Sequence, residues 1–170
     1  LSRSSAASDV YKRQALGPSS FANASNAMAI GGSSKATADS AVAIGVSANA
    51  SYAQSIAIGT DTTSAGFHSI AVGYGSAASA ANAAAFGRST IANTANATAL
   101  GVNAWATADS ALSVGSYSMA TADAALAVGS FANASTIHSI ARGANTTAGG
   151  AQALAFGVNS AASGDTSTAI

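Results

Sequence analysis

Few residues in this sequence carry groups that could perform catalysis or hold a cofactor. The chain of 170 residues has six acidic residues, all of them Asp, together with two His and no Cys. It contains no G-x-S-x-G nucleophile elbow, no pair of carboxylates at a constant spacing, and no Gly-rich phosphate loop between a strand and a helix. We therefore predict that the protein is not an enzyme, with no catalytic residue and no cofactor.

The two histidines, His68 and His138, are the side chains best suited to bind a metal ion. They occupy equivalent places in a 14-residue repeat, five repeats apart. If each repeat is one coil of stacked strands, the separation is roughly 24 Å at about 4.8 Å per coil, which one metal ion cannot bridge. We expect corner residues that hydrogen-bond locally, and no metal site.

The charge pattern excludes several classes of partner. Hydrophobic residues make up 49% of the chain, charged residues only 7%, and the formal net charge is zero. No basic stripe could follow a phosphate backbone, so no nucleic acid partner is expected. There is no run of 18 apolar residues and no signal peptide, so any membrane anchor or export signal must lie outside this segment.

Glycine sets the organisation of the chain, because eleven glycines stand at intervals of 14 residues. A fixed period indicates a stack of similar structural units rather than low complexity. Glycine suits a corner because it adopts a positive φ without steric cost. We assign one turn of each unit to these glycines: Gly17, Gly31, Gly45, Gly59, Gly73, Gly87, Gly101, Gly115, Gly129, Gly143 and Gly157.

Each unit has the pattern of two short strands. The three residues before a periodic glycine alternate large, small, large, as in Val42-Ala43-Ile44, and a second small residue recurs five places after the glycine. Further turns are expected near Asp39-Ser40, Asp109-Ser110 and Asp165-Thr166. The predicted fold is all-β, a parallel β-solenoid (β-roll) of 14-residue coils with two short strands per coil.

The width of one coil decides which side chains face inward. A circuit of fourteen residues is only roughly 46 Å around, so alanines fit between the strands and the large residues must point out. The resulting apolar stripe exceeds what a soluble monomer exposes, which predicts an interface between chains. The opposite assignment, large residues inside, needs a wider coil. The predicted interface consists of Ile30, Val42, Ile44, Ile56, Ile58, Ile70, Val72, Phe86, Leu100, Leu112, Val114, Leu126, Val128, Ile140, Arg142, Leu154 and Phe156.

Arg142 interrupts this stripe with a charge. Burying unpaired copies of it at an interface is costly. Three arrangements are open: an axial anion or water cluster, side chains that swing outward, or a local widening that admits solvent.

A second set of side chains is a candidate adhesive surface. Large aromatic and long side chains on corners or on the outer face often anchor protein partners, although scattered exposed apolar residues without a role fit the sequence equally well. The candidates are Lys35, Tyr74, Trp105, Tyr117, Met119 and Phe131.

The repeated phrases resemble those of YadA-type trimeric autotransporter adhesin heads. SAVAIG (40–45), QSIAIG (54–59), HSIAVG (68–73) and NAMAIG (26–31) carry the resemblance, which covers residues 15–170. It implies a left-handed parallel β-roll, a homotrimer, and a place on the outer membrane of a Gram-negative bacterium. The family's neck, stalk and C-terminal membrane anchor have no counterpart here.

The resemblance also implies a host extracellular matrix ligand of the collagen, laminin or fibronectin class. In the family the phrase NSVAIG is associated with collagen, but the leading Asn is kept only at Asn26, Asn82 and Asn96. A passive spacer in a surface fibre is the alternative reading. An ice-binding solenoid is a third, although no regular Thr ladder marks a flat face.

Residues 1–14 break the repeat and hold three of the six basic residues. We expect them to be a non-native or disordered leader, followed by about eleven coils over 15–170. Both ends of the chain interrupt the repeat, as expected for a fragment truncated at both ends.

Overall fold

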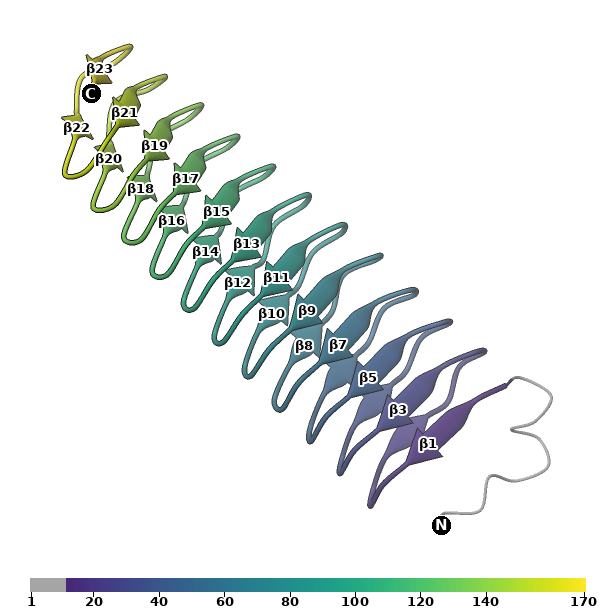
Figure 1. Cartoon of the computed structure of the whole chain (residues 1–170). Helices are drawn as coiled ribbons and strands as arrows, with labels where there is room; N and C mark the ends of the chain where they lie inside the picture. Colours follow the sequence, from purple (N-terminus) through teal and green to yellow (C-terminus); the bar gives the residue numbers. More distant parts are fainter. Residues whose placement is uncertain (1–11) are drawn as a thin grey trace.

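The strands recur at fixed places relative to the periodic glycines, and the glycine period fixes how they stack. The computed structural model describes residues 12–170, which wind into a row of coils (Figure 1). Each coil places one strand in sheet A and one in sheet B, as predicted. Among the described residues there is no helix long and apolar enough to cross a membrane.

Sheet A contains twelve strands, nearly all of three residues, which precede the periodic glycines. Their order in the sheet follows the order in the chain. The strands are β1 (Gln14–Leu16), β3 (Met28–Ile30), β5 (Val42–Ile44), β7 (Ile56–Ile58), β9 (Ile70–Val72), β11 (Ala84–Phe86), β13 (Thr98–Leu100), β15 (Leu112–Val114), β17 (Leu126–Val128), β19 (Ile140–Arg142), β21 (Leu154–Phe156) and β23 (Thr168–Ala169).

Sheet B contains eleven strands of two residues, four and five places after the periodic glycines. They are β2 (Phe21–Ala22), β4 (Lys35–Ala36), β6 (Asn49–Ala50), β8 (Thr63–Ser64), β10 (Ala77–Ala78), β12 (Ile91–Ala92), β14 (Trp105–Ala106), β16 (Met119–Ala120), β18 (Asn133–Ala134), β20 (Thr147–Ala148) and β22 (Ala161–Ala162).

All strand pairs are parallel, and each residue pairs with the residue fourteen places later. Ala85 pairs with Ala99 in sheet A, and Ala92 pairs with Ala106 in sheet B. Because the register is constant, a side chain on either face lies directly beside its counterparts in the neighbouring coils. Each position in the repeat therefore becomes a continuous row along the solenoid.

The core between the two sheets is built from small side chains. Ala99 in β13 and Ala106 in β14 are fully buried, as are their counterparts in most other coils. The largest side chains that are fully buried are those of Thr62, Thr90 and Thr146. The inward placement of the alanines is thus confirmed, and the opposite assignment is wrong because the thin core has no room for Ile, Leu or Phe.

A third inward position, three residues after each glycine, was not predicted. Thr62 and Thr90 occupy it, and their Oγ1 atoms donate hydrogen bonds to the carbonyl oxygens of Gly73 (2.6 Å) and Gly101 (2.5 Å). Because Ser and Thr recur at this position, nothing in the sequence indicated that it faces the core. Burial is tolerated because the hydroxyls bond to backbone carbonyls.

The periodic glycines lie at corners of the coils, and two features of the backbone favour glycine there. The φ of Gly101 is +136°, and a Cβ on it would lie 2.5 Å from the carbonyl oxygen of Gly115. The other periodic glycines, from Gly17 to Gly157, also have φ between +101° and +139°. From Gly17 to Gly143, the carbonyl of the next periodic glycine leaves no space for a side chain.

Two further positions in each coil have a left-handed backbone although most are not glycine. One lies two residues after the glycine, as at Tyr117 (φ 57°). The other lies five residues before the next glycine, as at Ser40 and Ser110 (both φ 57°) and Thr166 (φ 55°), where the sequence predicted turns. Left-handed backbone is unusual for such residues, so stacking between coils must support these corners.

The start of the regular structure differs from the expected boundary. Residues 1–11 of the expected leader lie outside the described residues. Gln14, however, is the first residue of β1 and pairs with Met28. Backbone pairing does not depend on the side-chain pattern, so the strand begins before the repeat is recognisable.

Candidate functional site

The most distinctive surface feature is a groove on the sheet B side of the solenoid. It has a volume of about 400 Å³ and is lined by Asn103, Trp105, Tyr117, Met119 and Phe131. We call these five residues the aromatic groove. They come from three successive coils, so the constant register brings together residues that are distant in the sequence.

Two rows of the repeat build the aromatic groove. Trp105 in β14 pairs with Met119 in β16, four residues after their glycines. Tyr117 and Phe131 stand two residues after their glycines, at left-handed corners with φ of 57°. Their backbone is identical, so their rings stack parallel, with centroids 5.1 Å apart and planes at 1°.

The groove is open to solvent and mainly apolar. Trp105 is 41% exposed, Tyr117 46% and Phe131 56%. Exposed aromatic side chains held on strands and tight corners lose little conformational freedom on binding a partner. Asn103 adds an amide at one end, so the groove combines apolar surface with a hydrogen-bonding group.

Not all of the candidate adhesive residues meet in this groove. Lys35 is exposed in β4, and Tyr74 is 58% exposed just after Gly73; neither lines the groove. Asn103 was missed by the sequence reasoning, although it stands two residues after Gly101, the place that Tyr117 and Phe131 occupy in the next two coils. Spacing alone could have identified it.

The outer face of sheet A has a different character. The predicted interface residues all lie on this face, at the two outward positions of its strands, and none is fully buried. Leu100, for example, is 47% exposed. In the described strands of sheet A, Arg142 is the only charged residue.

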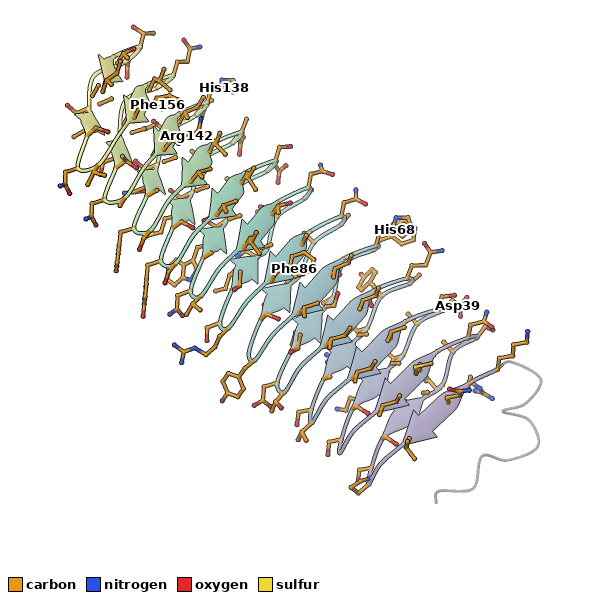
Figure 2. All side chains as sticks on the ribbon, viewed as in Figure 1. Asp39, His68, Phe86, His138, Arg142 and Phe156 are labelled. Atoms are coloured by element: carbon orange, nitrogen blue, oxygen red, sulfur yellow. The ribbon has the colours of Figure 1, made fainter. Side chains whose placement is uncertain are left out.

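Arg142 lies over an aromatic ring of its own chain. Its guanidinium carbon is 5.7 Å from the ring centroid of Phe156, its pairing partner in β21. Figure 2 shows the two side chains on neighbouring strands towards the C-terminal end. In the chain from residue 12 onward Arg142 forms no ion pair. The cation–π contact holds the guanidinium group above the apolar face.

The histidines occupy corners, but the expected local hydrogen bonds of their side chains are not formed. His68 and His138 have φ of 57° and 56°, and only their backbone N–H groups donate, to the carbonyls of Ala53 and Asp123. The ring of His68 instead packs on Phe67, with centroids 3.8 Å apart. The imidazoles project outwards from the corners (Figure 2), and within residues 12–170 neither ring forms a hydrogen bond.

Acidic side chains at these corners have a structural role. Oδ1 of Asp39 accepts a hydrogen bond from the backbone N–H of Ser25, and Oδ1 of Asp165 accepts one from Ala151. Each bond joins two neighbouring coils. Within residues 12–170 no three His, Asp or Glu side chains group closely enough to hold a metal ion.

Comparisons with known proteins agree with this geometry. The model of the YadA head domain repeat matches residues 15–34, 36–62, 64–90, 95–118, 120–146 and 148–170. The chain is similar in structure to the collagen-binding domain of the Yersinia adhesin YadA, with a TM-score of 0.52 and 23% identity over 79% of this chain and 67% of that one. A comparison with curated proteins gives no match.

Proposed function

This chain belongs to the YadA head domain repeat family, and we propose that it is the head of a homotrimeric bacterial surface adhesin. In this proposal the outer face of sheet A joins three chains, and the sheet B side faces outward and binds a host extracellular matrix protein. The observation that carries the proposal is the contrast between these two sides: a continuous apolar face and a separate aromatic groove.

The outer face of sheet A supports association of identical chains. Parallel sheets are normally covered on both faces, and here only the inner face is covered by the chain itself. The outward side chains are apolar along nearly the whole sheet, which is unfavourable in water. Burial of each would contribute about 1.5–3 kcal/mol. A closed trimer around an axis parallel to the solenoid covers all three faces equally.

The aromatic groove supports binding of a protein ligand on the other side. Trp105, Tyr117 and Phe131 offer large rigid apolar surfaces beside the Asn103 amide. The similar Yersinia structure is a collagen-binding domain, so a matrix protein of the collagen, laminin or fibronectin class is the proposed ligand. On this view, the protein is displayed on a Gram-negative outer membrane through a C-terminal anchor outside this sequence.

Two measurements on the full chain test the proposal. Light scattering is expected to give the mass of a trimer. Binding to immobilised collagen, laminin and fibronectin is expected for the wild type with at least one of them, and the triple variant Trp105→Ala, Tyr117→Ser, Phe131→Ser should bind that ligand at least about tenfold more weakly.

Tyr74→Ser is the matched control, because Tyr74 is an equally exposed aromatic residue outside the groove. It should leave binding unchanged. A trimer that binds none of these ligands would contradict the adhesive role and favour a passive spacer. A folded monomer would contradict the assignment of sheet A.

A further inference from the structure

Among residues 12–170, Arg142 is the one charged residue in the strands of sheet A, the face through which the chains are proposed to associate. It is paired in register with Val128 on one side and Phe156 on the other, and Ile140 is the other outward residue of its strand. Arginine is among the costliest residues to place on an apolar interface without a partner. Its presence at this position therefore requires a counter-charge.

The chain itself supplies no such counter-charge. Within residues 12–170, Arg142 forms no ion pair, and no strand of sheet A contains an acid. The corner acids Asp123 and Asp165 stand in the turns before β17 and β23, whereas the turn before β19, the strand of Arg142, contains no acid.

Identical partner chains cannot supply it either. In a closed trimer around an axis parallel to the solenoid, the chains meet at the same height, so each position faces copies of itself. Around Arg142 the partners bring only further copies of Val128, Ile140, Arg142 and Phe156. The neutralising group must then come from solution.

The geometry also keeps the arginine on the interface. Phe156 lies beneath the guanidinium group, which is 5.7 Å from the ring centroid, and an outward swing would lose this contact. Because stacked sheets pack about 10 Å apart, the axis is within reach of a long side chain. Three guanidinium groups would therefore surround one point.

We infer that three Arg142 side chains, one from each chain, form an axial site that binds a single inorganic oxyanion such as phosphate or sulfate. The inference rests on the proposed trimer, because one chain supplies only a third of the site. Guanidinium groups match the oxygens of such anions with paired N–H donors, whereas a chloride ion offers no second acceptor. The Phe156 rings exclude water from one side of the site.

Calorimetric titration of sodium phosphate into the proposed trimer of the 170-residue chain tests this site. The expected result is saturable binding with one phosphate for three chains, and sulfate competes for it. Arg142→Leu should remove the saturable heat entirely. Arg88→Leu is the matched control, since it removes an exposed arginine that lies just after Gly87, outside the strands of sheet A, and should leave phosphate binding unchanged.

Thermal unfolding at constant ionic strength gives a second test, which does not depend on the measured heat of phosphate binding. Millimolar phosphate or sulfate should raise the midpoint of the wild type by more than that of Arg142→Leu, because the general stabilisation by these salts acts on both proteins and binding at the site acts on the wild type alone. Arg142→Leu is expected to remain trimeric and folded because leucine restores the stripe.

The outcomes distinguish this inference from the proposed function. A trimer without saturable phosphate binding overturns the site and leaves the trimer in place. An equal response to sodium chloride overturns the choice of an oxyanion. Binding of one phosphate per chain, or binding that survives Arg142→Leu, also overturns it. A monomer would overturn the site and the trimer together.

Discussion

The two outer faces of the solenoid share one backbone but differ in how their side chains vary. On sheet A the outward residues are almost all apolar from β3 to β21, with few exceptions such as Thr98 and Arg142. On sheet B the outward row changes from Lys35 to Trp105 to Asn133 without a pattern. A face that meets copies of itself must be uniform, whereas a face that meets a different molecule can concentrate its contacts in one place.

A charged residue on the outer face of sheet A should have the largest effect, because it should prevent association of the chains. Ile70→Asp places three carboxylates on the proposed interface and removes three apolar side chains worth about 1.5–3 kcal/mol each. We expect loss of the trimer, measured as mass by light scattering. Ala77→Asp, on the outer face of sheet B in the same coil, should leave the mass unchanged. Equal effects would abolish the distinction between the faces.

A side chain added at a glycine corner should lower the stability of the whole coil, and with it both sheets. Gly101→Ala is expected to destabilise the fold by more than the roughly 0.4–1 kcal/mol by which Gly→Ala stabilises a protein at a compatible site, because φ is +136° and the carbonyl of Gly115 blocks the Cβ. Urea unfolding measures the loss. For Gly149→Ala, where nothing lies within 4 Å, no loss should be seen.

Two adjacent alanines of β11 point to opposite faces of sheet A, so substitutions at them test the inner and the outer face separately. Ala85 is buried between the sheets, so Ala85→Leu should destabilise the fold by about 1–3 kcal/mol through overpacking. Ala84 points outward, and Ala84→Leu should stabilise the proposed trimer instead. Thermal unfolding of both variants tests this, and a destabilised Ala84→Leu would argue against packing on that face.

The aromatic groove should contribute least to stability. Tyr117→Ser removes a ring that is 46% exposed and stacked on Phe131, so the free energy of unfolding should fall by less than about 1 kcal/mol. The oligomeric state proposed for the wild type, a trimer, should be unchanged in this variant. A larger loss, measured by urea unfolding, would mean that the groove supports the fold and is not a free surface.

Much of the fold could be predicted from the sequence, because each position in the 14-residue repeat forms one row of side chains along the solenoid. The glycine period fixes the register, and the alternation in Val42-Ala43-Ile44 fixes which side faces inward. The left-handed corners were harder to predict from the sequence, because Ala124 (φ 53°) and Tyr117 have no intrinsic preference for that backbone. Neighbouring coils impose it, and stacking of this kind is not encoded in local propensity.

The candidate site was only partly predictable for the same reason. Trp105, Tyr117, Met119 and Phe131 could be selected as large exposed residues, but they belong to two different rows of the repeat. That the two rows converge on one groove depends on the corner between them. Lys35 and Tyr74 were selected from the sequence by the same criterion, but they lie outside the aromatic groove.

The constant fourteen-residue register also determines how a gene for this fold can change. Loss of one codon between two glycines leaves a coil of thirteen residues, which cannot pair in register with both neighbours and also keep its alanines inward. Duplication of forty-two nucleotides, in contrast, inserts a coil that stacks on its neighbours and lengthens the rod by about 4.8 Å. Because neighbouring repeats are similar in sequence, recombination between them can adjust the reach of the protein in equal steps and preserve both faces.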